Sequence, residues 1–487
     1  MATLTTAWNI AVSSLQADQA ALNVSANNTA NVNTPGYTRE EPVWEENAPA
    51  TLNGLSFGTG ASVASVRSQR DRVLEQSLDQ QTQTQQATAT RLAALQSLEG
   101  VFSSTTATGT TTPNGGISSS LSGFFTAVAA LEGDPSDDSA REGVLSAAES
   151  LAQSFSGAVT ELDQQQASLD AESQSVVTQV NALTEAVAGL NRQIQTLDPD
   201  TDAGTLEDQR QYDLNQLSQL VGVNQIKTED NGLTITTAGG ALLVSEGRSF
   251  ALPSAPSGGV THYYDSEGND LTTALASGGG QLGGYLTTRD QDIPQVLTVL
   301  DTLAGGLAAK LNEIQESGST AGGTSSAGYP LFNIPAGGGL PGSVAGGITV
   351  AITDPSLLAA AGAGDGPSDG SNAALMADVQ NAALLTLAEP GSPYQVTSAT
   401  SPTDFLADFV ATLGSLVSQT SSLNAAQQAS LSQTQTQRDS LSAVNTDDEA
   451  SALSIMERAY EASSKVFSIL DTIFASALNL GEETTVT

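Results

Sequence analysis

The chain has 487 residues, of which 53 are acidic and 15 are basic, so its formal net charge is −38 at neutral pH. This shortage of Lys and Arg argues against binding to nucleic acid or to an anionic membrane, because both need clustered positive charge. The absence of Cys excludes disulfides, thiol nucleophiles and Cys-bound metals. The length is sufficient for about two to four domains with a sizeable core.

Targeting signals of the usual kinds are missing from the sequence. No apolar run approaches the ~20 residues of a membrane span. The first basic side chain is Arg39, so the basic start of a secretory signal peptide is absent. We therefore expect either a cytosolic protein or one exported by a route that reads no cleavable signal.

The N-terminal segment is predicted to be a helix from Thr3 to about Asn33, because it contains neither Gly nor Pro. Its apolar residues recur at spacings of three, four or seven and form one seam, interrupted by Asp18: Leu4, Trp8, Ala11, Leu15 and Leu22. Four Asn residues crowd its last turn, where they are expected to form hydrogen bonds: Asn27, Asn28, Asn31 and Asn33.

A turn follows this helix at Thr34–Gly36. Pro35 cannot continue a helix, and Gly36 is expected to adopt a positive φ. The aromatic ring of Tyr37 is expected to pack against a neighbouring helix with its hydroxyl bonded. Residues 41–66 are strand-like and turn-like, with Gly residues between short apolar runs.

The middle of the chain is mostly helical in pattern. A helix is predicted from about Gln69 to Phe102, and its Gln/Thr-rich part at residues 79–85 resembles a second polar run at residues 432–437. Such runs are either solvated helix or two helices side by side as a connecting rod. A long helix is predicted to start at Asp134-Pro135 and to bury residues at intervals of seven: Phe155, Leu162, Leu169, Val176, Leu183, Leu190 and Leu197.

Beyond residue 222 the pattern changes. Short β-like runs separated by Gly occupy residues 223–264, and a helix is predicted from about Asp292 to Gln315. Residues 318–370 are rich in Gly, Ala, Ser and Pro, with one candidate strand at Ile348–Ile352. Helices are again predicted at Asn372–Leu387 and Phe405–Val417.

The C-terminal segment from Thr446 to Leu480 carries the clearest seam of the chain. Apolar residues recur every seven positions, with others three positions later: Leu453, Met456, Tyr460, Phe467, Leu470 and Phe474. Val466 and Ile473 are expected to widen this seam. Thr446 and Glu449 have the spacing of a capping box. A seam of this kind needs a partner helix, and the N-terminal helix is the expected partner.

No catalytic, cofactor or metal site is predicted. The acidic run that begins at Asp198 starts like an EF-hand loop, but Ala203 stands where Gly is needed and Gln209 where Glu is needed. We expect a solvated loop in residues 198–208 instead of a calcium site. His262 is the only histidine, which rules out a His-based zinc triad, and it is expected to be an ordinary polar side chain of the β region.

Both ends of the chain resemble one protein superfamily. The run from Ala21 through Asn27-Asn28-Thr29-Ala30-Asn31 to Arg39 is similar to the N-terminal signature of bacterial flagellar axial proteins (rod, hook and hook-associated). The runs Ser442–Glu449, Arg458–Ala462 and Ala477–Leu480 are similar to their C-terminal signature. Two signatures at opposite ends of one chain form a stronger signal than either alone.

Internal stretches narrow this resemblance to one family. Phe124-Phe125 with Gly133–Ser136, Asp208-Gln209-Arg210, and Gly279–Leu286 with Arg289-Asp290 resemble the helical domain of the flagellar hook-associated protein 1 family. The resemblance covers most of residues 1–318 and 371–487. Members often carry a larger β domain near residue 318, so this copy is expected to be truncated there.

The resemblance implies a structural subunit at the hook–filament junction of an extracellular flagellum. It also implies export without a cleavable signal, a ring of copies, contacts with the hook protein and the third hook-associated protein, and an export chaperone on the C-terminal helix. No cofactor is implied. The assembly interface is expected to include Leu4, Trp8, Leu15, Leu22, Asn27, Asn31, Pro35, Gly36, Tyr37, Leu453, Met456, Tyr460, Phe467, Leu470 and Phe474.

We predict a mainly α protein with a β lobe, in which the terminal helices pair as a coiled coil and long helices form a middle bundle. The predicted parts are residues 1–66 with 440–487 (terminal coiled-coil assembly domain), 67–221 with 288–317 and 371–439 (helical bundle), 222–287 (β lobe) and 318–370 (Gly-rich surface insertion). Two other hypotheses stay open. One is another hook-type axial subunit, and the other is an acidic extracellular helical binding protein or adhesin.

Overall fold

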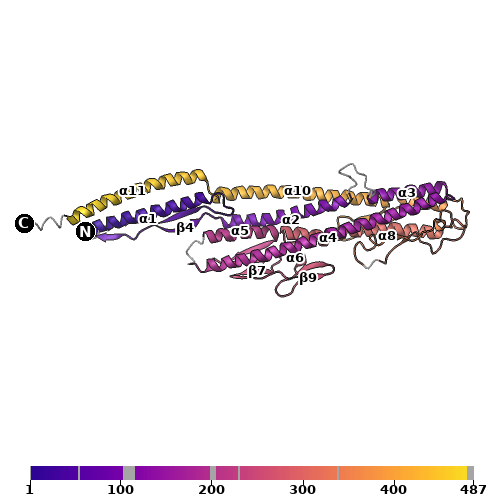
Figure 1. Cartoon of the computed structure of the whole chain (residues 1–487), viewed down its shortest axis with the longest axis horizontal. Coiled ribbons are helices and arrows are strands. Elements are labelled where there is room, and N and C mark those ends of the chain that lie inside the picture. Colours follow the sequence, from indigo (N-terminus) through magenta and orange to yellow (C-terminus); the bar gives the residue numbers. More distant parts are fainter. Residues whose placement is uncertain are drawn as a thin grey trace, which may run out of the picture.

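The molecule is a long rod, and the helices from the two ends of the chain lie side by side at one tip (Figure 1). The computed structural model describes residues 2–52, 55–102, 116–197, 204–228, 231–336 and 339–479. The predicted fold class, mainly α with a β lobe, is confirmed.

The terminal layer at this tip is built around α1 (Ala2–Ala30). On one side α1 packs along α11 (Thr446–Asn479), and on another it contacts the antiparallel pair β1 (Glu40–Glu46) and β4 (Ala61–Ser68). The hairpin of β2 (Ala50–Leu52) and β3 (Leu55–Phe57) extends from this pair.

The shaft of the rod consists of α2 (Arg72–Phe102) and α10 (Pro402–Ser442). The predicted connecting rod is confirmed, because the Gln81 side chain accepts hydrogen bonds from Ser430 (3.3 Å) and Thr434 (3.0 Å). Arg438 of α10 pairs with the buried Glu75 of α2 at 2.9 Å. The helix predicted at 405–417 is therefore the start of a much longer one, since polar residues continue it along α2.

The far end of the rod holds the larger hydrophobic core. Its main elements are α3 (Ile117–Gly133), α4 (Asp138–Gln195), α8 (Ile293–Ser317) and α9 (Ser371–Asp378). The long helix α4 begins later than predicted. Asp137 caps it by accepting from the amide of Ser139 (2.9 Å), and Asp134-Pro135 lie before it.

The interval of seven along α4 holds for only part of the helix. Phe155, Leu162, Leu169 and Val176 are buried, but Leu183 and Leu190 are only half-buried and Leu197 lies beyond the helix. A straight helix has 3.6 residues per turn, so a repeat of seven drifts around it by about 20° per repeat. The buried face consequently moves to Val180, Val187, Asn191 and Ile194.

The β lobe lies beside α4 and α5 (Thr205–Leu220). Four antiparallel strands form its sheet in the order β5 (Val223–Lys227), β6 (Leu233–Thr237), β7 (Leu242–Ser245) and β8 (Arg248–Ser249). A separate hairpin pairs β9 (Ser254–Ser257) with β10 (Val260–Tyr263). The short helices α6 (Thr272–Ala276) and α7 (Gly280–Thr287) lead back to the shaft.

The Gly-rich segment 318–370 differs from the predicted surface insertion. Leu331, Phe332 and Leu358 are buried in the core of the far end, although only short strands form here: β11 (Phe332–Asn333) and β12 (Thr349–Val350). The Asp301 carboxylate accepts from the amides of Gly342, Val344 and Ala345 (2.7–3.0 Å). Small residues let this backbone approach α8, which composition alone does not reveal.

The helix predicted at 372–387 is also shorter than expected. It ends as α9 at Asp378, followed by a 3₁₀ turn at Val379–Asn381. Leu385–Leu387 form strand β13, which pairs with β14 (Val396–Thr400) and buries Leu385 and Leu387 in the core.

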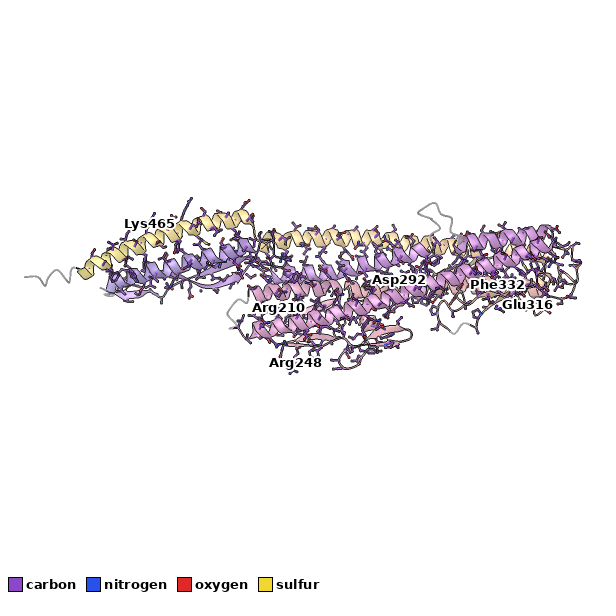
Figure 2. The ribbon with its side chains drawn as sticks, in the orientation of Figure 1. Arg210, Arg248, Asp292, Glu316, Phe332 and Lys465 are labelled. Atoms are coloured by element: carbon purple, nitrogen blue, oxygen red, sulfur yellow. The ribbon has the colours of Figure 1, made fainter. Side chains whose placement is uncertain are left out.

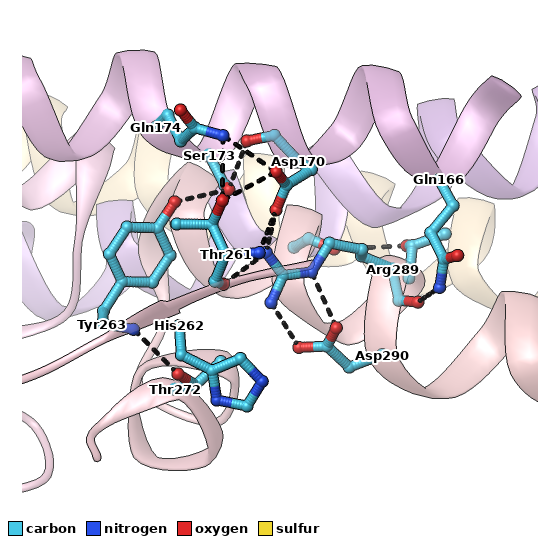
Figure 3. A network of polar contacts seen from close by, with 12 residues as sticks. Gln166, Asp170, Ser173, Gln174, Thr261, His262, Tyr263, Thr272, Arg289 and Asp290 are labelled. Carbon is cyan, nitrogen blue, oxygen red and sulfur yellow. Dashed lines mark hydrogen bonds and ion pairs between the residues drawn. The ribbon is translucent and has the colours of Figure 1, made fainter. Parts of the chain in front are cut away.

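One buried arginine joins the β lobe to the helices (Figure 3). Arg289 is fully buried in the π-helical turn Thr288–Asp292, between α7 and α8. Its guanidinium binds Asp170 of α4 (2.6 Å), the neighbouring Asp290 (2.7 Å) and the carbonyl of Thr261 (2.9 Å). A buried charge is tolerated only when it is paired and hydrogen-bonded, as here.

We predict that Arg289→Met destabilises the chain by about 3–5 kcal/mol, because Asp170 then keeps a charge without its partner. Urea unfolding of the purified chain measures this loss. Arg248→Met, on the exposed strand β8, is the control and should change stability by less than about 0.5 kcal/mol. Equal stability of the two variants would contradict the prediction.

A buried carboxyl group lies where α2, α5 and β5 meet. Asp79 is 2% exposed and accepts from Gln225 (2.7 Å) and Gln211 (3.2 Å). Burial raises the pKa of Asp79 to about 7, although these two bonds oppose the rise. In the unfolded chain an Asp has a pKa of about 4. Between about pH 4 and pH 7 the folded state therefore binds more protons at this position than the unfolded state does.

Stability should therefore fall as the pH rises from about 4 through 7. We predict that Asp79→Asn removes this slope and stabilises the chain at pH 8 by on the order of 3 kcal/mol. Denaturant unfolding at a series of pH values measures both effects. Glu142→Gln, an exposed change in α4, should keep the slope of the original chain.

Candidate assembly interface

An aromatic cluster holds α1 against α11. The Trp8 ring lies 4.4 Å from the Phe467 ring and 5.4 Å from the Phe474 ring, measured between centroids, and the second pair is T-shaped. Edge-to-face geometry of this kind is favourable beyond the apolar area that it buries. The two predicted seams thus meet at their aromatic residues.

Most other predicted seam residues are half-buried in this single chain: Leu4, Leu15, Leu22, Leu453, Met456 and Leu470. Tyr460 stays 39% exposed. Val466 and Ile473 do not widen the seam as predicted, because both are exposed on α11. The terminal layer therefore closes only in part within one chain.

A polar group interrupts the seam at Asp18. Ser463 of α11 donates to the Asp18 carboxylate (2.8 Å) and shares a hydrogen bond with Ser14 (2.9 Å). Polar residues within an apolar seam fix how two helices are aligned, because a shift leaves them without partners. Asp18 thus helps to set the register of α1 against α11.

Glu449 forms the polar centre of the layer. Glu449 is 2% exposed. Its carboxylate accepts hydrogen bonds from Ser25 (2.6 Å), Arg39 (2.8 Å) and Asn28 (3.3 Å). The hydrogen bond that Arg39 donates to Glu449, together with the charge of this carboxylate, raises the pKa of Arg39 above its usual range. One carboxylate thus joins α11 to α1 and to Arg39, the residue just before β1.

The predicted capping box at Thr446 and Glu449 is not formed. Asn445 caps α11 instead, because its side chain accepts from the amide of Asp447 (3.0 Å). The Glu449 carboxylate makes tertiary contacts instead of accepting from the amide of Thr446. Arg39 offers it a charged donor, which binds more strongly than a backbone amide.

Asn28 connects Glu449 to the turn that follows α1. Its carbonyl oxygen accepts from the Tyr37 hydroxyl (2.8 Å) and from the amide of Glu40 (3.0 Å), and its NH₂ donates to the Glu40 carbonyl (2.9 Å). Burial, with nearby carboxylates, raises the pKa of Tyr37 above its usual range. The predicted bonding of the Tyr37 hydroxyl is confirmed.

Asn27 and Asn31, two of the predicted interface residues, lie outside this network. They are bonded to each other at the surface (2.8 Å). The sequence pattern predicts hydrogen bonding for Asn28 as one of four asparagines, but it does not indicate that Asn28, Arg39 or Glu449 lies at the interface. The available signal was that all three lie within the two terminal signatures.

The turn at Pro35 and Gly36 meets the helical body. Gly36 has φ +81°, as predicted, and a Cβ added there would lie 3.1 Å from the Cβ of Tyr212 in α5. Nearby, Asp208 accepts from the amide of Thr38 (3.2 Å) and pairs with Arg70. These contacts fix the angle between the terminal layer and α5.

The remaining candidate sites give no support for metal binding or catalysis within the described residues. Residues 198–203 of the acidic run lie outside the described residues. Residues 205–208 begin α5, and Glu207 and Asp208 are buried, so the solvated loop predicted over 198–208 is wrong for this part. His262 bonds to Asp270 at 2.6 Å, in the β lobe. In the described part of the chain no group of three His, Cys, Asp or Glu residues could hold a metal. No described helix is long and apolar enough to cross a membrane.

Comparisons with known protein families agree with this arrangement. The family described as "Flagella basal body rod protein" matches residues 9–38, and "Flagellar basal body rod FlgEFG protein C-terminal" matches residues 435–480. "Flagellar hook-associated protein FlgK helical domain" matches residues 98–332. The first two matches cover the segments that meet at Glu449.

Individual proteins give a consistent result. Flagellar hook-associated protein 1 of Bacillus subtilis is 25% identical, with 96% of each chain covered. Its counterpart in Escherichia coli is 30% identical over 67% of this chain and 59% of its own length. A solved structure titled as the flagellar hook junction protein FlgK from Burkholderia pseudomallei covers 74% of this chain and 99% of its own, with TM-score 0.63 and 17% identity.

The paired ends and the two terminal matches define the class: the chain is a flagellar axial protein of the rod and hook type. Within that class, the helical-domain match and the full-length similarity make it a relative of flagellar hook-associated protein 1. The resemblance found in the sequence is thereby confirmed.

We predict that Glu449→Ala opens the terminal layer, because Ser25, Asn28 and Arg39 lose their shared acceptor at a cost of about 1–3 kcal/mol, although the part-exposed Arg39 keeps Glu41 as a partner (3.0 Å). Hydrogen exchange of the amides in α1 and α11 should become faster, while α4 stays protected. Asp448→Ala is the matched control, since Asp448 is the exposed neighbouring carboxylate. Unchanged exchange in the Glu449 variant would contradict a central role for this residue.

Proposed function

We propose that this chain is a structural subunit of the bacterial flagellum and forms the junction between hook and filament. One observation carries the proposal: the two segments that match axial-protein families fold together around Glu449. We interpret a layer made from both ends of a chain as an assembly element. The helical body and β lobe between the ends can differ from one axial protein to another.

The finer details follow from the resemblance. Copies of the chain form a ring through their terminal layers, with the hook protein on one side and the third hook-associated protein on the other. An export chaperone binds the C-terminal helix before export, and no cleavable signal is used. We also propose the four-part division given above, with segment 318–370 packed into the helical body.

The predicted interface residues keep their proposed role in assembly, and we propose Asn28, Arg39 and Glu449 as further members because they hold the terminal layer together. The helical match over residues 98–332 supports a hook-associated protein over another hook-type subunit. An adhesin with coiled-coil ends gives no reason for matches to axial-protein families at both ends.

The direct test is localisation. An epitope-tagged chain, expressed in its own bacterium from which the natural gene is removed, should restore filament attachment. Immunogold labelling should place the tag between hook and filament. A strain that attaches filaments normally without the chain, or labelling spread over the cell surface, would refute the proposal.

The aromatic cluster gives a sharper test of the assembly element. We predict that Phe467→Ser with Phe474→Ser abolishes incorporation at the hook, because each lost ring costs up to about 3 kcal/mol of packing at this half-buried seam. Immunoblots of purified hook–basal bodies measure incorporation, and circular dichroism checks that the helical body stays folded.

Leu242→Ser is the control, since it removes an exposed apolar side chain from the β lobe. This variant should incorporate as the original chain does. Normal incorporation of the double Phe variant would show that the seam is not the assembly element.

A further inference from the structure

The side of α11 that faces away from α1 carries a second stripe, which we call the outer stripe. Its members follow one another at spacings of three or four residues, and all are exposed: Ile455, Arg458, Ala462, Lys465, Ile469 and Ile473. Ile455 and Ile469 keep 66% and 61% of their surface exposed. Figure 2 shows Lys465 on this side of α11. Such spacing is typical of a helix face that packs on another surface.

The β strands lie on the other side of α1 from α11 (Figure 1). They also expose apolar side chains. Trp44 in β1 and Phe57 in β3 remain about half exposed, at 49% and 48%. Glu45 and Glu46, which follow Trp44 in β1, are also exposed. We call Trp44, Glu45, Glu46 and Phe57 the β surface.

Phe57 lies close to the acidic part of this surface. A Cβ added at Gly58, the next residue, would be 3.8 Å from Oε1 of Glu46. The β surface therefore combines two aromatic rings with two carboxylates, and the outer stripe combines three isoleucines with two basic side chains.

The charges of the outer stripe are complementary to those of the β surface. The chain is strongly acidic, and basic residues such as Arg39, Arg289 and Arg438 bind carboxylates of their own chain. Within the described residues, Arg458 and Lys465 form no ion pair. Two copies of an acidic chain repel each other, so a stable contact needs basic side chains of one copy opposite acidic ones of the other.

We propose that the outer stripe docks against the β surface of a second copy of this chain. Ile455, Ile469 and Ile473 contact Trp44 and Phe57 of that copy, and Arg458 and Lys465 pair with its Glu45 and Glu46. The two surfaces are different, so the contact is heterologous and generates a ring or a helical row. This proposal rests on the proposed function and adds which surfaces meet.

Cross-linking tests the contact in the assembled flagellum. Trp44→Cys and Ile469→Cys are placed together in the full chain, which has no other Cys. Hook–basal bodies purified from the bacterium are then treated with a bismaleimide. We expect covalent dimers and longer ladders of the chain, and none from either single variant.

The matched control joins Ile469→Cys with Leu242→Cys, because Leu242 is exposed on the β lobe. It should give no ladder. Incorporated chains that form no ladder, that form the same ladder in the control, or that cross-link through position 469 to another protein would each overturn the proposal.

Charge reversal gives a second, independent test. Arg458→Glu with Lys465→Glu should lower incorporation about tenfold, and so should Glu45→Lys with Glu46→Lys. The four changes together should restore incorporation to within about twofold of the original chain. A combined variant that incorporates no better than its parents would overturn the proposal. If the variant with the Cys pair does not incorporate, the charge-reversal result decides the docking proposal.

The two levels of inference fail differently. If the original chain is absent from hook–basal bodies, the proposed function and the docking proposal both fall. If the chain is present, but neither cross-links through these positions nor responds to combined charge reversal, only the docking proposal falls.

Discussion

The terminal layer depends on one buried carboxylate, that of Glu449. Its bonds to Arg39, Ser25 and Asn28 connect residues more than 400 positions apart in the sequence. A buried ion pair adds little net stability, because both charges lose their water. Its stronger effect is on alignment. A seam that repeats every seven residues could slide by one repeat, but Glu449 would then lose its partners, and Ser463 would lose Asp18.

The shaft makes this distant contact possible. Polar side chains hold α10 along α2, and at its end Ser442 bonds to the carbonyl of Gln69 and accepts from the amide of Arg39 (both 2.9 Å). Once the shaft has formed, Glu449 lies only a few residues from the partners it needs. The folding of the helical body has then already offset the entropic cost of bringing the two distant ends of the chain together.

The periodic elements could be predicted from the sequence because their signals are local. The repeat of α11 fixed which face meets α1, and the Pro35-Gly36 turn implied the positive φ that Gly36 adopts. Glu449 was misassigned to a local cap, because spacing along the chain does not reveal a distant Arg39. Segment 318–370 was wrongly predicted to lie at the surface for a related reason. Small residues are buried where backbones approach closely, and a pattern of large apolar residues does not reveal such burial.

The order of the elements along the chain has a consequence for incomplete chains. The helix α1 is made first, and its partner α11 is near the other end of the sequence. A product that stops at the end of α10 has the shaft and the β lobe, but it lacks Phe467, Phe474 and Glu449 altogether. Its α1 is therefore unpaired, and it has no closed terminal layer. In the proposed assembly role, the pairing of the two ends distinguishes complete chains from truncated ones.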